Sequence, residues 1–295
     1  MRAPAWILLI AGCSAQDAVH LQQQSTLEGP VVGFALSSSD SKAQAGMVGN
    51  TCAVETSNGL IGDDHDVVAD EEDRVHDTYA GHTLVGGSGT LVTLAEGSTL
   101  EIESSAQKSG VISAFLTDGA TIGLRDHAGC WAFVGEQEVE LSIDCGHSVT
   151  DAQRESATLI ATDGSAVVFV DAGGTSIVPE EGNLIAWDAS AEVLYLAERG
   201  EDWIKALNEG GDTLWATSLD GTVQSIDDLV GQNAVMVMVE QEDGSGELVT
   251  LDAADGAPIA STETPSAGES VLTGNNGKTV AVVLPEMIHF FAVSR

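Results

Sequence analysis

The chain has 295 residues, and its 46 Asp and Glu residues against 10 Lys and Arg residues give a formal net charge of -36 at pH 7. That balance excludes a nucleic-acid partner, because binding phosphates requires clustered Lys and Arg. With 43% hydrophobic residues, the chain can build a core, so the acidic residues belong to a folded protein rather than to a disordered tail. The 33 glycines and 6 prolines, with abundant Val, Thr and Ala, favour many short strands joined by tight turns.

The first residues have the pattern of a secretion signal. An apolar run extends from Ala3 to Ile10, and Ala11 and Gly12 stand directly before Cys13. The run is too short to span a bilayer, which takes about 20 apolar residues. The string from Ile10 to Cys13 resembles a bacterial lipoprotein lipobox, in which the cysteine is acylated and becomes the mature N-terminus.

This resemblance implies a signal peptide over residues 1–12 and a palmitate-type lipid on Cys13. Ser14 follows where an Asp would mark retention in the inner membrane, so we expect an anchor in the bacterial outer membrane. Residues 14–30 are polar and Gln-rich, so we expect a flexible tether over residues 13–30 and a folded domain over residues 31–295. The alternative is a short buried N-terminal segment with an incidental cysteine.

Three further cysteines fit an oxidising compartment. Cys130 and Cys145 lie symmetrically about an expected turn at Glu136 to Val139. In an antiparallel hairpin with that turn they would face each other, where a disulfide can form. Cys52 is left over and is expected to be a buried thiol. The cysteine spacing does not suggest a zinc site.

The body of the chain repeats one phrase: an apolar strand, a turn rich in Asp, Asn and Gly, and a second apolar strand. Residues 168–178 align without a gap with residues 205–215, and a weaker seventh copy falls at residues 287–293. The last apolar residue before each turn recurs at intervals of 40, 40, 36, 37 and 44 residues, at Val54, Leu94, Val134, Val170, Leu207 and Leu251. A period near 40 is what a four-stranded propeller blade needs.

The fifth unit shows the pattern best. Its expected strands, from the innermost to the outermost, are residues 183–187, 193–197, 203–207 and 212–217. The phrase from Trp203 to Trp215 resembles the repeat of quinoprotein-like propellers (PQQ-type and WD40-like), which has an apolar strand, Ala-Leu-Asp, a Gly turn and Leu-Trp. The resemblance implies an all-β chain forming a single β-propeller. We expect seven blades, with six or eight as alternatives, each of four antiparallel strands.

The seventh unit contains only three expected strands, so the N-terminal region must supply the fourth if the ring is to close. Two segments are candidates, Val19 to Leu27 and Val31 to Leu36. The choice stays open, because Val31 to Leu36 is also needed as the first strand of the first unit.

Acidic residues gather in the connections that open on one face of a propeller. The expected binding face includes Glu180, Glu181, Glu198, Asp202, Glu242 and Asp243. A face this negative attracts cations, cationic peptides or divalent metals. The densest acidic stretch is a candidate Ca²⁺ site, because Ca²⁺ favours several carboxylates on one loop: Asp63, Asp64, Asp66 and Asp70. The alternative, favoured by the lack of an ordered ligand pattern, is a solvated acidic loop.

The sequence contains no G-x-S-x-G elbow, no H-E-x-x-H pattern and no Walker loop, so no catalytic residue is predicted. We expect a non-enzymatic binding or scaffold lipoprotein of the bacterial cell envelope, monomeric, with Ca²⁺ as the only cofactor to consider. Its acidic face would bind an envelope protein or a cationic ligand. The alternative is an enzyme with its site at the propeller channel: a divalent-metal-dependent hydrolase or lyase, or a quinoprotein-like dehydrogenase.

Overall fold

A computed structural model describes the chain in segments. The described residues are 19–28, 31–36, 44–48, 51–56, 59–61, 74–79, 82–86, 91–95, 101–106, 111–116, 122–126, 129–134, 137–140, 148–153, 158–162, 164–171, 174–188, 190–229, 231–268, 270–274, 277–284 and 287–294. Side-chain burial is described for residues 19 and 21–23 and, with short gaps, from residue 160 onward. No helix long and apolar enough to cross a membrane occurs in these segments.

The described strands form seven antiparallel sheets of four strands each, which we number as blades 1 to 7. Blade 1 is β2 (Val31–Leu36), β3 (Gln44–Val48), β4 (Thr51–Thr56) and β5 (Gly59–Ile61). Blade 2 is β6 (Arg74–Tyr79), β7 (His82–Gly86), β8 (Leu91–Ala95) and β9 (Glu101–Ala106). Blade 3 is β10 (Val111–Leu116), β11 (Ile122–Asp126), β12 (Gly129–Val134) and β13 (Gln137–Glu140). Blade 4 is β14 (Ser148–Gln153), β15 (Thr158–Thr162), β16 (Val167–Asp171) and β17 (Gly174–Val178).

The remaining blades come from the C-terminal half and one N-terminal strand. Blade 5 is β18 (Leu184–Asp188), β19 (Val193–Ala197), β20 (Trp203–Asn208) and β21 (Thr213–Ser218). Blade 6 is β22 (Thr222–Leu229), β23 (Ala234–Glu240), β24 (Gly246–Asp252) and β25 (Pro258–Thr264). Blade 7 is β26 (Ser270–Gly274), β27 (Thr279–Leu284), β28 (Met287–Ser294) and β1 (His20–Glu28).

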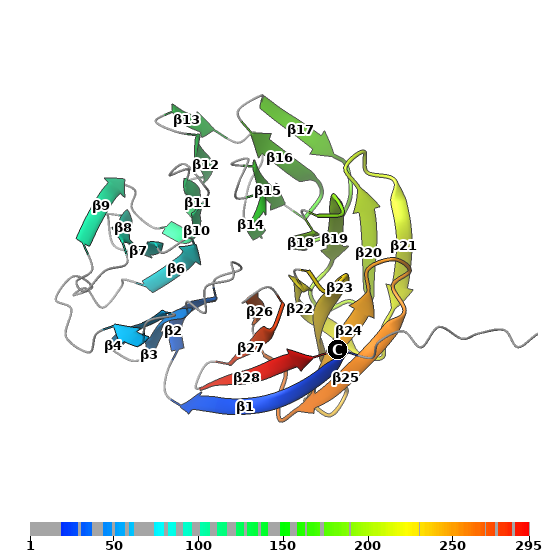
Figure 1. The fold of residues 1–295 in the computed structure, drawn as a ribbon. Helices are drawn as coiled ribbons and strands as arrows, with labels where there is room; N and C mark the ends of the chain where they lie inside the picture. The colour runs from blue at the N-terminus through cyan, green and yellow to red at the C-terminus, as the bar shows by residue number, and fades with distance from the viewer. Residues whose placement is uncertain are drawn as a thin grey trace, which may run out of the picture.

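The first strands of successive blades contact one another around a closed circuit. The strand β2 contacts β6, the contacts continue through β10, β14, β18, β22 and β26, and β26 contacts β2 again. Figure 1 shows the sheets arranged around a central axis in this order. The expected fold, an all-β propeller of four-stranded antiparallel blades, is confirmed.

The N-terminal strand closes the ring. β1 pairs antiparallel with β28, with His20 opposite Ser294 and Glu28 opposite Met287. Val19, which precedes the strand, is 2% exposed and packs between blades 6 and 7. Of the two candidates for the closing strand, the segment from Val19 is therefore the correct one. The expectation of a flexible tether up to residue 30 is wrong for this segment, because its backbone completes a sheet.

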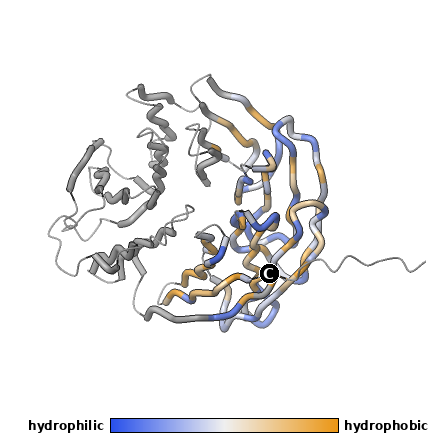
Figure 2. The backbone as a smooth tube through the Cα atoms, in the orientation of Figure 1, coloured by the Kyte–Doolittle hydropathy of each residue, from blue (hydrophilic) through white to orange (hydrophobic). Residues whose placement is uncertain are grey.

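In blades 5 and 6, side-chain burial decreases from the inner strands to the outermost strand. Every residue of β19 is buried, and so are the first six of β23, because the second strand of a blade has a neighbouring blade on both faces. The outermost strand β21 is mostly exposed. Figure 2 shows hydrophobic stretches along the strands and hydrophilic ones at many of the turns. The expected strand bounds in blade 5 lie within one residue of those observed.

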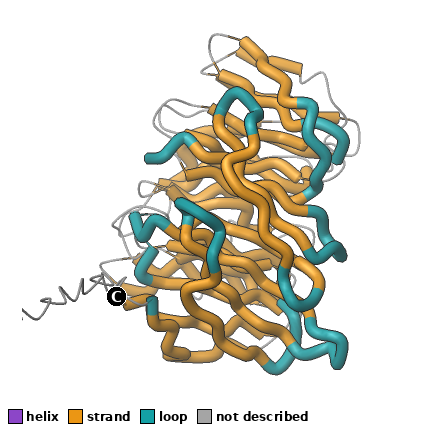
Figure 3. The backbone as a smooth tube through the Cα atoms, turned by 90° about the vertical axis from the view of Figure 1, so that its right-hand side faces the viewer, coloured by secondary structure: helices purple, strands orange, loops and turns teal. Residues whose placement is uncertain are grey.

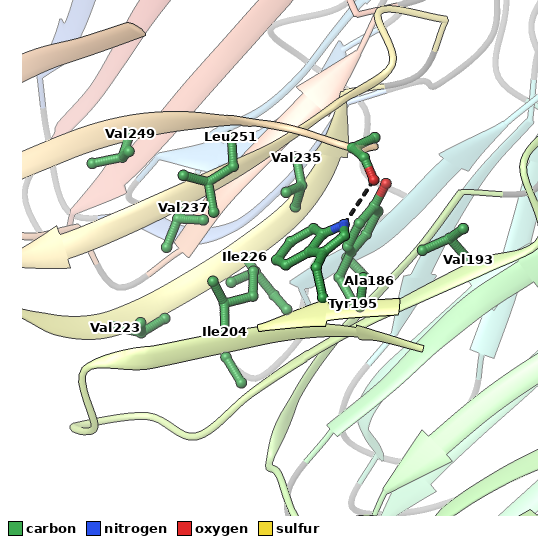
Figure 4. Close-up of a cluster of buried hydrophobic side chains, with 14 of the residues drawn as sticks. Ala186, Val193, Tyr195, Ile204, Val223, Ile226, Val235, Val237, Val249 and Leu251 are labelled. Atoms are coloured by element: carbon green, nitrogen blue, oxygen red, sulfur yellow. Dashed lines mark hydrogen bonds between the residues drawn. The ribbon is translucent and has the colours of Figure 1, made fainter. Parts of the chain in front are cut away.

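The core of the protein lies between blades rather than within them. Separate clusters of buried apolar side chains fill the seams between blades 4 and 5, 5 and 6, and 6 and 7. In the seam between blades 4 and 5, the rings of Phe169 and Trp187 meet edge to face with centroids 5.4 Å apart. Figure 4 shows the seam between blades 5 and 6, where side chains from both sheets interdigitate. Each blade is therefore stabilised mainly by its neighbours.

The side chain of Trp215, in blade 5, contacts blade 6. Its indole N–H donates a hydrogen bond to the Ala253 carbonyl at 2.8 Å, and the ring lies 6.0 Å from that of Tyr195. Gly256 allows this contact, because a Cβ on it would lie 2.5 Å from the indole ring. Trp215 is therefore a packing residue, and its hydrogen bond joins blade 5 to blade 6.

We predict that a chain starting at residue 31 is much less stable than one starting at residue 19. The shorter chain lacks β1, so the edge of β28 is left unpaired and the packing of Val19 and Leu21 is lost. Burial of two such side chains contributes about 4 kcal/mol to the free energy of unfolding. Its loss lowers the Tm of a chain of this size by about 10 °C. Calorimetry of the two chains measures the difference, and equal melting temperatures would contradict closure by β1.

We also predict that Gly256→Ala lowers the free energy of unfolding by about 2 to 4 kcal/mol, because the new methyl group collides with Trp215 and the residue has a φ of +72°. Gly244→Ala is the matched control: Gly244 has a φ of +82° but open space around it, so only the backbone strain of about 1 to 2 kcal/mol remains. Urea unfolding compares the two variants. Equal losses would show that the tryptophan contact contributes nothing.

Candidate functional site

Two sets of loops lie side by side at one end of the blades. They link the second strand of a blade to the third, and the last strand to the first strand of the next blade. Gly200 N–H donates to the Val223 carbonyl at 2.8 Å, and Leu219 N–H donates to the Asp202 carbonyl at 2.6 Å. Figure 3 shows loops gathered at the two ends of the blades. These hydrogen bonds fix the loops of neighbouring blades against each other.

We name this end of blades 4 to 6 the acidic loop face. Its described acidic residues are Glu180, Glu181, Glu198, Glu201, Asp202, Asp220, Glu240, Glu242 and Asp243. Arg199 is the one basic residue in the described part of these loops. In blades 5 and 6 alone, six exposed acidic residues lie on the acidic loop face: Glu198, Glu201, Asp202, Asp220, Glu242 and Asp243. The described turns at the opposite end of these two blades carry four: Glu192, Glu209, Asp212 and Asp255.

All six residues predicted for a binding face lie on the acidic loop face. They follow β17 (Glu180 and Glu181), β19 (Glu198 and Asp202) and β23 (Glu242 and Asp243). Five of the six side chains are exposed, and that of Glu180 is half-buried. The fold thus brings together carboxylates that are as far apart as residues 180 and 243 in the sequence. Their role in binding stays a prediction.

Glu180 forms an ion pair with a cation of the protein itself. Lys205 Nζ lies 2.5 Å from Glu180 Oε2 and 5.2 Å from the centroid of the Trp203 ring. Both charged side chains are partly exposed, so the pair contributes at most about 1 kcal/mol to stability. The Lys205 ammonium group therefore lies near both a carboxylate and an aromatic ring, and both groups attract cations.

Asp243 shapes its own loop. Its Oδ1 accepts hydrogen bonds from Ser245 Oγ at 2.5 Å and from Ser245 N–H at 2.9 Å. These hydrogen bonds hold the pKa of the Asp243 carboxyl below its ordinary value, and the bond from the Ser245 hydroxyl has the largest effect. The side chain is exposed, so its negative charge faces solvent at neutral pH.

Several predicted site residues lie outside the described residues: Cys13, Asp63, Asp64, Asp66, Asp70 and Cys145. Cys130 lies in β12, which pairs with β13 so that Val134 is opposite Gln137. Gln137 to Glu140 therefore form a strand, so the expected turn at Glu136 to Val139 is wrong. This register does not centre the hairpin between Cys130 and Cys145, so the disulfide loses the symmetry on which it was predicted.

The sequence analysis missed a buried polar group at the opposite end of the seam between blades 5 and 6. We name Asp188, Tyr195 and Asp228 the seam cluster; their side chains are 6%, 0% and 5% exposed. Asp188 is the last residue of β18, and its Oδ1 accepts hydrogen bonds from the N–H groups of Ser190 and Ala191 in the turn that follows. One sequence alone does not show that this turn meets Asp228 of the next blade.

The surroundings of the seam cluster shift two pKa values. Burial raises the pKa of Asp228 well above its ordinary value, and the charges of Asp188 and Asp227 raise it further. Burial also raises the pKa of Tyr195, and Asp228, Asp188 and Asp252 add to this effect. The Tyr195 hydroxyl therefore keeps its proton, and it is buried without a hydrogen-bond partner. Among the described residues, no group of three or more His, Cys, Asp and Glu side chains could hold a metal ion.

No protein-family model matches the sequence, and no curated protein matches it. A chain of the mitotic checkpoint complex is similar in structure, with a TM-score of 0.72 and 12% identity over 100% of this chain and 99% of that chain. Streptogramin B lyase is similar with a TM-score of 0.64 and 12% identity, over 94% and 98%. BBS1N, in a complex with ARL6DN, is similar with a TM-score of 0.64 and 11% identity, over 87% and 88%.

These similar structures share the arrangement of the chain while their sequences differ almost completely from it, and their chemistry does not transfer at such identities. The likeness covers nearly the whole chain in the first two comparisons. Together with the closed circuit of four-stranded sheets, it shows that this chain has a β-propeller fold.

Proposed function

We infer that this protein is a non-enzymatic binding lipoprotein of the bacterial cell envelope, whose acidic loop face binds a cationic segment of another envelope protein. The lipid on Cys13 anchors it to the outer membrane, with the propeller attached through the residues before β1. The observation that carries this proposal is the concentration of exposed carboxylates on one end of blades 4 to 6.

Electrostatics favours a cationic partner for this face. Carboxylates from neighbouring loops act together, and their summed field attracts cations and speeds association at low salt. Backbone hydrogen bonds hold the loop from Glu198 to Asp202 against the start of blade 6, so the backbone of this loop loses little freedom when a partner binds. The contact between Lys205, Glu180 and Trp203 supports the same chemistry, because the face already holds one ammonium group in this way.

We predict that Glu198→Gln with Glu242→Gln weakens binding of a lysine-rich peptide about fivefold at low salt. Both side chains are exposed, and loss of two charges near the ligand removes about 1 kcal/mol of attraction. The matched control is Glu192→Gln with Glu209→Gln, which removes the same charge from the opposite end of blade 5 and should change the affinity less than twofold. Isothermal titration calorimetry at two salt concentrations measures both. Equal weakening in the two double variants would refute the acidic loop face as the site.

The anchor is tested separately. We predict that Cys13→Ser moves the protein from the outer-membrane fraction to the soluble fraction of the envelope, because the residue that would carry the lipid is gone. Fractionation with an antibody against the chain measures this. A variant that stays in the membrane fraction would contradict lipid anchoring, and it would leave the peptide-binding result untouched.

A further inference from the structure

The seam cluster lies where blades 5 and 6 meet, and it takes no part in the proposed binding. Alternate residues of a strand share a face, so Asp188 lies on the same face of β18 as Ala186, and Asp228 on the same face of β22 as Ile226. Ala186 and Ile226 both belong to the apolar cluster that fills the seam between blades 5 and 6. The two carboxyl groups therefore enter one apolar seam from opposite sides.

Neither carboxyl group can easily turn away to solvent. Asp188 Oδ1 accepts hydrogen bonds from Ser190 Oγ at 2.6 Å and from two backbone N–H groups of its turn. Asp228 is fixed through its backbone, because Thr273 Oγ1 of blade 7 donates to its carbonyl. The Asp228 N–H donates to Asp227 Oδ1 at 3.0 Å, and Asp227 Oδ2 accepts from Thr273 N–H at 2.6 Å. The strand that carries Asp228 is thus held on its other side by blade 7.

The Tyr195 hydroxyl is the second observation. It comes from β19 of blade 5, is fully buried, and has no hydrogen-bond partner. The three carboxyl groups that act on it are Asp228, Asp188 and Asp252, so the hydroxyl lies within reach of their charge. A buried polar group without a partner is rare in a folded protein and calls for an explanation. While the seam is closed, the Tyr195 O–H group donates no hydrogen bond.

We propose that the seam between blades 5 and 6 is a pH-responsive joint, which is closed while Asp228 carries a proton and loosens when that proton passes to solvent. The ionised Asp228 then faces Asp188 across the seam, inside an apolar layer that screens charge poorly. Repulsion between the two carboxylates acts directly on the contact between the blades. The charges that act on Asp228 are those of Asp188 from β18 and of Asp227 from its own strand, and Asp228 in turn acts on the Tyr195 hydroxyl from β19.

The direction of the effect follows from proton binding. The folded state holds the Asp228 proton more tightly than the unfolded state, whose aspartate pKa is about 3.9. Stability contributed by this proton is therefore present at low pH and is lost as the pH rises towards the pKa in the folded state. At a pH above both values the joint is at its weakest.

The test is the melting temperature of the full chain between pH 5 and pH 9, for the wild type and for Asp228→Asn. We expect the wild-type Tm to fall as the pH rises, and the variant to melt about 4 °C higher at pH 8 with a flatter profile. Asp220→Asn is the matched control: Asp220 is an exposed aspartate on the acidic loop face, so it reports the general repulsion in a chain of this charge. It should keep the wild-type profile. Equal changes in the two variants would overturn the proposal.

Asp188→Asn provides a second variant in case Asp228→Asn does not fold. Its amide oxygen can still accept the hydrogen bonds of the turn, while the charge that faces Asp228 is gone. We expect its Tm profile to level off at a lower pH than that of the wild type. Exchange of the Trp215 indole N–H, which bridges the same seam, should be slower than in the wild type at pH 8 and equal at pH 5. A wild-type profile in both variants would overturn the proposal.

Discussion

Closure of the ring is the constraint on which the rest of this structure depends. The second strands of blades 5 and 6, β19 and β23, are buried on both faces, and such strands are stable only between two neighbouring sheets. An open ring would expose one such face at each end. The pairing of β1 with β28 removes both open ends, and Val19 adds apolar packing beside it. An N-terminal segment therefore completes the core formed by the C-terminal half of the chain.

The same constraint divides the polar residues between the two ends of the blades. Strands that are buried along their length leave only turns and loops for charge, so the carboxylates that remain exposed collect at the loop ends. On the acidic loop face they stay in water, where they favour a cationic partner. Asp188 and Asp228 are the exception, because the seam between blades 5 and 6 encloses them. Exposed carboxylates therefore collect at one end of these blades, and two buried carboxyl groups lie between blades 5 and 6 at the other.

Much of the fold followed from the sequence, because strands, turns and repeats are local patterns. The bounds of β18 to β21 were predicted within one residue, and the six predicted carboxylates share one face. What failed depended on contacts between distant segments. The polar segment from His20 to Glu28 had the composition of a tether, yet it is a strand because β28 offers it an edge. Asp228 showed no distinctive pattern, since its burial results from the packing of two blades against each other.

The central claim is that the closed ring presents one end of blades 4 to 6 as the surface that a cationic segment recognises. Hydrogen exchange of the full chain, measured with and without a saturating lysine-rich peptide, tests this most directly. We expect slower exchange in the loops around Glu198 to Asp202 and Glu240 to Ser245, and no change in the turns around Glu192 and Glu209. Protection confined to those turns, or spread evenly over both ends of the blades, would contradict it.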